Sequence, residues 1–446
     1  MSQDYMKERP VLPLVLSMSV PMMLSMLVSS LYNIVDSYFV AQISEGAMTA
    51  LSLVFPLQNL LTAVSVGFGI GINAVTAFFL GAGRNHQADQ AVSSGLMLNV
   101  FHGIVLFAGC TVVMPYFLRA FTTDTAIIDY GVRYSNIVFA FSVIVTTGIS
   151  FEKIFQSVGK VKIAMASMLA GCITNIVLDP FFIFGFGFIP AMGIEGAALA
   201  TGLGQTVTLV IYLAAFVKTP LPVHFSLKAA KPDPAICRRL YAVGIPATLN
   251  LALSSLLITA LNGILSAYSQ LYVLILGVYY KLQTFIYLTA NGIVQGIRPL
   301  VGYNYGAGRS DRVKQIFRVA LTFSLIIMMA GTLLCFAIPE QLIGLFSSNP
   351  ETIQEGAGAL RIISCGFIVS SISIIVSGTF EGLGKGMPSL IISLIRYLAI
   401  IPAAFVLSRR LGPSGVWHAF WIIELIAAAA AGLLYCSFSR RFLHQE

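Results

Sequence analysis

The chain has 446 residues, of which 57% are hydrophobic and only 10% are charged, and its mean hydropathy is +0.87. Soluble domains carry about 25% charged residues, so this composition excludes a soluble globular protein and indicates a chain that lies in lipid. The net charge of +8 does not predict nucleic-acid binding, because the basic residues follow a membrane-topology pattern. The six cysteines show neither disulfide nor metal-ligand spacing, so no metal and no cofactor are expected.

Apolar runs of roughly 20 residues, the length that crosses a bilayer core as a helix, recur along the chain. We predict six such helices on each side of a segment rich in Pro, Lys and Arg. The first set is expected at 13–40, 48–79, 91–117, 130–152, 161–184 and 193–217. The second set is expected at 240–265, 271–303, 312–338, 354–379, 387–408 and 414–438.

The two sets of helices are copies of one unit. Gly-Ala-Gly-Arg stands at 81–84 and again at 306–309, a step of 306 − 81 = 225 that also relates Pro21 to Pro246. Chance matches do not share one offset, and such a repeat determines the architecture. The sequence therefore predicts an all-α membrane protein with twelve transmembrane helices in two six-helix lobes. The expected domains are an N-terminal lobe, a cytoplasmic linker and a C-terminal lobe, at 1–217, 218–239 and 240–446.

Lys and Arg collect on every second loop, which is the positive-inside pattern of membrane proteins. Arg84 lies in such a loop, whereas the loops near 41–47 and 185–195 have no Lys or Arg. Only Arg119, Arg409 and Arg410 fall clearly on the outer side, and the pair Arg409 and Arg410 is a mild exception to the pattern. We expect a multi-pass protein of the plasma (inner) membrane with both termini in the cytoplasm. Because each copy has an even number of spans, the copies form a parallel repeat, as in many secondary transporters.

Two acids fall inside predicted spans of the first lobe, where charge is costly and indicates function. They are Asp36 and Asp179, both expected in the outer half of that lobe. Asn175, four residues before Asp179, shares its helix face. The repeat places apolar Leu261 opposite Asp36 and, through a local step of 402 − 180 = 222 between two prolines, Ile401 opposite Asp179. We therefore predict a proton- or cation-binding pocket in the first lobe only, with solvation near the outer interface as the alternative.

The second lobe has its own charges near the middle of the membrane, at Lys281, Arg396 and Glu424. A Lys281–Glu424 or an Arg396–Glu424 pair would satisfy the acid, and both a structural and a substrate-binding role stay open for these residues. Arg298 is expected to snorkel from the inner end of its helix.

Two further features recur in both copies. Gly67-x-x-x-Gly71 and Gly292-x-x-x-Gly296 predict close helix packing. Pro21 and Pro246 lie inside helices, where proline removes a backbone hydrogen bond and bends the helix. Each bend serves either as a gate or only as a fixed shape.

Five stretches in combination resemble the multidrug and toxic compound extrusion (MATE) family over essentially the whole chain: SVPMMLSMLVSSLYNIVDSYFV, the repeated GAGR, FQSVGK, TNIVLDPFFIFGFG and MGIEGAALATG. The resemblance implies a V-shaped fold of two lobes and drug export driven by protons or sodium. It carries coupling roles onto Asp36, Asn175, Asp179 and Thr201. Lys281-Leu-Gln and Glu424 resemble the bacterial multidrug efflux branch. A sodium-coupled branch also uses acids in helices 7 and 10, which we expect to lack Asp and Glu within the span here.

The leading interpretation is a secondary antiporter, not an enzyme, that expels amphipathic and cationic drugs in exchange for protons or Na⁺ and so confers antibiotic resistance. We expect the protein to be a monomer in membrane lipid whose partners are small-molecule drugs and organic cations, and we expect no binding to nucleic acid. One alternative is a flippase for a lipid-linked substrate from the same superfamily. Another is a channel or sensor without coupled transport. The chain has no Walker A, H-E-x-x-H or G-x-S-x-G motif, which argues against a nucleotide-driven pump and against the enzymes that carry those motifs.

Overall fold

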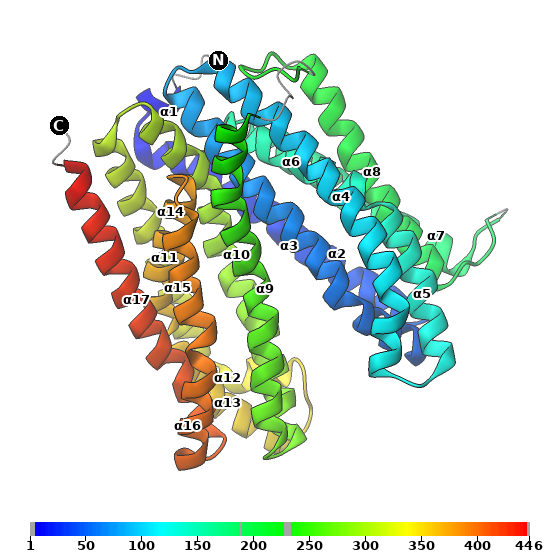
Figure 1. Cartoon of the computed structure of the whole chain (residues 1–446). Coiled ribbons are helices and arrows are strands. Elements are labelled where there is room, and N and C mark those ends of the chain that lie inside the picture. Colours follow the sequence, from blue (N-terminus) through cyan, green and yellow to red (C-terminus); the bar gives the residue numbers. More distant parts are fainter. Residues whose placement is uncertain (1–4, 188, 227–232, 444–446) are drawn as a thin grey trace. The chain divides into compact units, whose positions relative to one another are not determined.

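The computed structural model describes residues 5–187, 189–226 and 233–443, most of which are helical (Figure 1). Lys228 and Lys231 of the predicted linker lie outside the described residues. The helices up to the linker are α1 (Tyr5–Glu8), α2 (Val11–Ala41), α3 (Glu45–Gly81), α4 (Asn85–Phe121), α5 (Thr125–Ala140), α6 (Ser142–Ser157), α7 (Val161–Phe184) and α8 (Ile194–Lys218). After it come α9 (Pro234–Ser266), α10 (Gln270–Gly306), α11 (Ser310–Ala337), α12 (Pro339–Gly344), α13 (Pro350–Ser364), α14 (Phe367–Gly382), α15 (Gly386–Leu398), α16 (Ile400–Leu411) and α17 (Ser414–Leu443).

The twelve predicted spans are all present. Within the described residues, ten segments are long and apolar enough to cross a membrane, and two bent helix pairs bring the number to twelve. The bent pairs are α5–α6, with an angle of 47°, and α13–α14, with an angle of 51°. The sequence predicted each pair as one uninterrupted helix. Because the pairs begin at Thr125 and Pro350, a step of 350 − 125 = 225, the bend belongs to the repeated unit.

Local capping follows the same repeat. The Ser44 hydroxyl accepts a hydrogen bond from the Ala47 backbone N–H at the start of α3, and the Ser269 hydroxyl accepts one from Leu271 at the start of α10. A hydroxyl at this position satisfies one of the backbone N–H groups that the first turn leaves without a partner. The two caps are 269 − 44 = 225 residues apart, so the two copies begin corresponding helices by the same chemistry.

The chain forms two compact units, and the division between them does not fall in the linker. The first unit comprises Leu24–Thr248, and the second comprises Ser2–Met23 and Leu249–Glu446. Both crossing points lie two residues after a proline, Pro21 in α2 and Pro246 in α9. Since proline has no N–H to donate to the preceding turn, these are natural places for a helix to pass from one packed body to another. The predicted lobes thus differ from the compact units by the exchange of two half-helices.

Glycines hold the exchanged half-helices within their units. In the first unit a Cβ atom on Gly67 of α3 would lie 2.5 Å from the backbone nitrogen of Thr248 in α9. In the second unit a Cβ atom on Gly292 of α10 would lie 2.8 Å from the Cα atom of Met23 in α2. Contacts this short leave room only for hydrogen, so glycine permits the close helix approach that is typical of membrane proteins. The packing role predicted for these glycines is confirmed.

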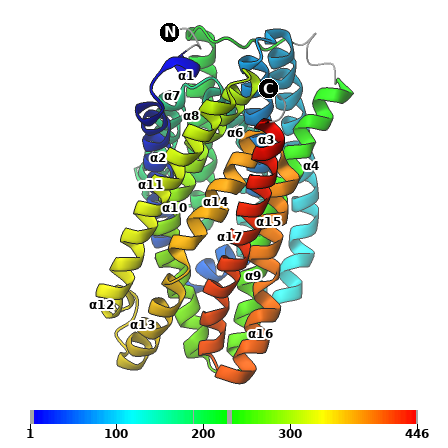
Figure 2. The same ribbon diagram turned by 90° about the vertical axis from the view of Figure 1, so that its left-hand side faces the viewer.

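Each unit is a bundle in its own right. In the first unit, α3 packs against α4, α5 and α6, and α7 packs against α8 (Figure 1). In the second unit, α14 packs against α10, α11 and α17, and α16 packs against α17 (Figure 2). The α7–α8 pair and the α14–α17 pair position the charged residues described below.

Candidate functional site

Two neighbouring helices of the first unit bring three of the predicted site residues together. The Asn175 amide of α7 lies 3.4 Å from Asp179 Oδ1 and 3.3 Å from Thr201 Oγ1 of α8, and it donates to both. Glycines allow this approach, because a Cβ atom on Gly204 of α8 would lie 2.8 Å from the Gly171 carbonyl oxygen of α7. Asn175 and Asp179 are one helical turn apart, as predicted. The packing of α8 then adds the Thr201 hydroxyl to the pair.

Asp36 joins this group from α2. Its charge interacts with that of Asp179, and Tyr32, one turn before Asp36, interacts with both acids. Asp36 is 9% exposed and Asp179 is fully buried. The sequence placed the two acids at similar depth on separate helices, and the structure makes them members of one cluster.

Several oxygens of this cluster have no partner. Within the described part of the chain, Asp36 Oδ1, Asp179 Oδ2 and Asn175 Oδ1 are buried and accept no hydrogen bond. A carboxylate taken out of water costs several kcal/mol unless charge or hydrogen bonds compensate it. Carboxylate, amide and hydroxyl oxygens are also the ligands that hard cations prefer. These are chemical groups that can accept a proton or coordinate a small hard cation.

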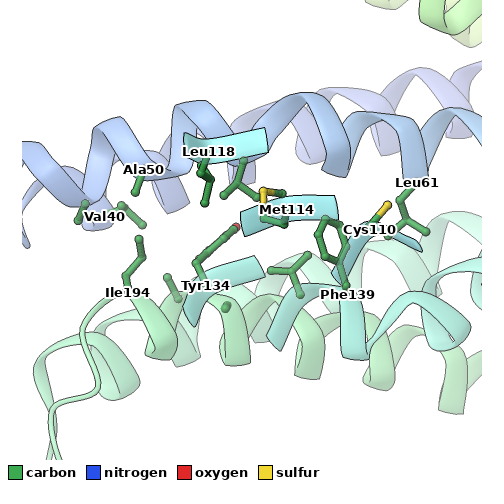
Figure 3. Packing of buried hydrophobic residues seen from close by; sticks show 14 of the residues in the cluster. Val40, Ala50, Leu61, Cys110, Met114, Leu118, Tyr134, Phe139 and Ile194 are labelled. Carbon is green, nitrogen blue, oxygen red and sulfur yellow. The ribbon is translucent and has the colours of Figure 1, made fainter. Parts of the chain in front are cut away.

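A buried tyrosine closes the cluster on the side of α5. Tyr134 is 2% exposed, its hydroxyl hydrogen-bonds the side chain of Gln58 in α3, and it interacts electrostatically with Asp36. Figure 3 shows its ring inside the apolar cluster that also contains Val40 and Ile194. This apolar packing keeps bulk water from one side of the acids. The sequence analysis did not identify Tyr32, Gln58 or Tyr134 as neighbours of the acids. The one signal available was the i to i+4 spacing of Tyr32 and Asp36, which places both on one face of α2.

The second unit has no such pair of acids at the repeat-related positions. Leu261, opposite Asp36, is fully buried and apolar, and Ile401 is partly buried. The buried acid of α17, Glu424, accepts a hydrogen bond from Arg396 Nε of α15 at 2.5 Å. Of the two ion pairs that the sequence allowed for Glu424, the one with Arg396 forms, and Lys281 lies elsewhere.

A second buried ion pair corrects two expectations. Arg298 of α10 does not snorkel, because its Nη2 atom lies 2.7 Å from Oε2 of Glu381. We expected the helix to end at 379 and the span to lack acids, but α14 continues to Gly382 and Glu381 is 6% exposed. Ser389 Oγ donates to the other carboxylate oxygen at 3.0 Å. With its charge and its hydrogen bonds satisfied, this glutamate fits inside the helix.

The buried acids thus fall into two classes. In the described residues the buried carboxylates are those of Asp36, Asp179, Glu381 and Glu424. Each glutamate has an arginine partner, whereas neither aspartate forms an ion pair with a cation of the described residues. The two aspartates thus differ from the two glutamates in having no side chain there that balances their charge.

Comparisons with known proteins agree with this architecture. The MatE family model matches residues 21–181 and 246–406, two segments that are again 246 − 21 = 225 residues apart. The "Multidrug export protein MepA" of Staphylococcus aureus (strain MSSA476) is 27% identical over 441 residues, which cover 96% of this chain and 94% of that protein.

Solved structures share the fold. The structure of "MATE in the bent conformation" superposes with a TM-score of 0.94 at 23% sequence identity, covering 100% of this chain and 99% of the other. The "outward-facing conformation of a multidrug resistance MATE family transporter of the MOP superfamily" gives a TM-score of 0.93 at 24% identity, with 99% of both chains covered.

Proposed function

The chain belongs to the MatE family of membrane transporters, and from this premise we propose that it is a secondary active multidrug efflux antiporter that exchanges drugs for protons or Na⁺. The observation that carries the proposal is the pair of buried aspartates, Asp36 and Asp179, without a cationic partner in the described residues. A site whose negative charge is not balanced by the protein binds a coupling ion when it is available and releases it when a competing cation or a change of shape favours release. The name of the staphylococcal relative supports multidrug export as the activity.

The same negative charge suits the proposed substrates. Amphipathic organic cations partition into the membrane and are attracted to buried acids by charge. Ion and drug then compete for the first unit, so that binding of one promotes release of the other. Thr201 and Asn175 would position the acids, because the Asn175 amide bridges Asp179 and Thr201. Pro21 and Pro246, at the crossing points of α2 and α9, are the proposed bending points.

The flippase alternative has weaker support. A cavity for a lipid-linked pyrophosphate would need several free cations inside the membrane. Of the three candidates, Arg298 and Arg396 each hold a glutamate at hydrogen-bond distance. Lys281 alone is left for such a substrate.

Transport by purified protein tests the proposal. We expect proteoliposomes to accumulate a fluorescent organic cation such as ethidium against its concentration gradient when the coupling ion is more concentrated inside the vesicles than outside. A pH gradient and a Na⁺ gradient are applied separately, with the membrane potential clamped by valinomycin and K⁺. Protein-dependent ethidium movement that only follows its own gradient would indicate a channel, and no movement under either gradient would refute the antiporter.

We also propose that both termini and the linker lie in the cytoplasm, because basic residues collect on alternate loops. Asp233 lies within the predicted linker, directly before the first residue of α9. In a background without the six native cysteines, Asp233→Cys is expected to resist an impermeant maleimide added to intact cells. It should react after the membrane is permeabilised. Ready labelling in intact cells would invert the topology.

A further inference from the structure

A cavity of about 480 Å³ lies in the second unit between α9 and α10. Its apolar wall includes Ile258 and Leu274, and Gly277 opens it, because a Cβ atom on Gly277 would meet nothing within 4 Å. Pockets for small molecules have volumes of roughly 300–1,000 Å³ and combine apolar walls with a few polar groups. This cavity meets both conditions.

The polar groups of the cavity lack partners. Lys281, Asn262 and Gln270 line it, and none of the three side chains forms a hydrogen bond or an ion pair with the described part of the chain. The hydroxyl of Tyr280, also in the lining, is buried and makes no hydrogen bond within the same residues. Lys281 and Gln270 are exposed, and Asn262 and Tyr280 are half-buried, so all four polar side chains are available to a molecule that enters the cavity.

Lys281 makes the site positively charged. It is the twelfth residue of α10, roughly 16 Å along the helix axis from Gln270, so its charge is placed well inside the span. Lys281 Nζ lies over the ring of Phe346, 5.6 Å from the ring centroid. A cation–π contact offsets only part of the cost of a charge in the membrane. The other two intramembrane cations of this unit, Arg298 and Arg396, have carboxylate partners, and the ammonium group of Lys281 is left for an anion.

The order of the lining residues along the helices indicates how the chemical groups of a ligand would be arranged. Asn262 and Gln270 flank the short connection between α9 and α10, whereas Lys281 lies three turns further along α10. A molecule that fits has an anionic head at Lys281, an apolar body beside Leu274 and Gly277, and a polar group near the two amides. A single lysine matches one negative charge, such as a carboxylate or a phosphodiester.

We infer that the second unit contains a binding site for amphipathic monoanions, centred on Lys281 and separate from the aspartate site of the first unit. One part of the inference rests on the proposed export function, namely that carboxylate-bearing and zwitterionic amphiphiles are exported as well as organic cations. Binding itself requires no coupling ion. The same chemistry is offered by a free carboxylate amphiphile and by the phosphodiester of an anionic phospholipid.

Binding of a matched probe pair tests the site. The purified full-length protein is placed in phosphatidylcholine nanodiscs and titrated with 1-pyrenebutanoate or with uncharged 1-pyrenebutanol, and the signal of empty nanodiscs is subtracted. We expect Lys281→Met to raise the Kd of the butanoate roughly tenfold or more, since the variant loses a charge-assisted hydrogen bond to the carboxylate. Binding of the butanol should be unchanged. Lys281→Arg should retain butanoate binding, and Gly277→Leu should weaken both probes by filling the cavity.

Lys385→Met is the matched control, because Lys385 also lies over a phenylalanine ring, that of Phe438 at 4.6 Å, but does not line this cavity. It should leave both Kd values unchanged. Repeating the titration in nanodiscs with phosphatidylglycerol separates the two sources of the anion: competition identifies a lipid headgroup, and its absence identifies a free amphiphile. Equal butanoate affinity of the wild type and folded Lys281→Met, or of the wild type and Gly277→Leu, would overturn the site. Retained binding with failed transport would contradict only the proposed export function.

Discussion

Replacing Asp36 by Asn is expected to abolish gradient-driven drug efflux while the protein remains folded. The carboxylate of Asp36 is buried, and its Oδ1 atom accepts no hydrogen bond from the described residues. Asparagine keeps the shape and removes the charge, which imitates permanent occupancy by a proton. Since the variant no longer buries a charge without a partner, we expect its thermal midpoint in detergent to equal or exceed that of the wild type. In the proteoliposome assay described above, gradient-driven ethidium transport should fall to the level of liposomes without protein.

The control for Asp36→Asn is the same substitution at Asp129, an exposed residue of α5 whose contact with Arg133 lies at the surface. Surface ion pairs contribute about 0–1 kcal/mol, so Asp129→Asn should transport normally. Asp179→Asn should behave like Asp36→Asn, because the two acids belong to one cluster. Full, gradient-dependent efflux by Asp36→Asn would refute the coupling site. If efflux by the wild type requires Na⁺ at constant pH, the coupling ion is Na⁺ and the site is unchanged.

Much of the fold follows from local sequence patterns. The lengths of the apolar runs predict the twelve spans, and the step of 225 predicts the duplication. The same step relates the helix caps Ser44 and Ser269 in the structure. The bends within α5–α6 and α13–α14 were not predicted, because each pair is one continuous apolar run in the sequence. The exchange of half-helices depends on which helices pack together, which a periodicity within one helix does not specify.

The candidate site was predictable in the part that lies on one helix. Asn175 and Asp179 share a face through their spacing, and the structure joins them by a hydrogen bond. Asp36, which interacts electrostatically with Asp179, and the hydroxyl of Tyr134 come from other helices, so no spacing within one helix predicts them. Glu381 shows the opposite limit. The predicted helix ended at 379, two residues before it, and the arginine that pairs with it stands 381 − 298 = 83 residues earlier in the chain.

Replacing Glu424 by Gln is expected to destabilise the protein strongly, with transport reduced in proportion to the folded protein that remains. Arg396 Nε lies 2.5 Å from Glu424 Oε1, and both side chains are mostly buried. Removal of one partner leaves the other charge buried and uncompensated, which costs about 3–5 kcal/mol in proteins. The ring faces of Tyr287 and Tyr397 near the guanidinium replace only part of the lost interaction. The measurement is the thermal midpoint in detergent, followed by size-exclusion chromatography.

Two further variants separate a structural pair from a ligand site. Arg396→Met combined with Glu424→Gln removes both charges, and we expect it to recover most of the lost stability, because an apolar replacement of a buried ion pair is often neutral or stabilising. Glu340→Gln is the control at an exposed pair, since Glu340 and Arg361 are 3.9 Å apart at the surface, and it should change the midpoint little. A Glu424→Gln protein with a wild-type midpoint and no transport would instead make Glu424 a ligand of ion or drug. A double variant no more stable than Glu424→Gln alone would show that the glutamate acts through contacts other than Arg396, of which the hydrogen bond from Ser373 Oγ at 3.4 Å is the first to test.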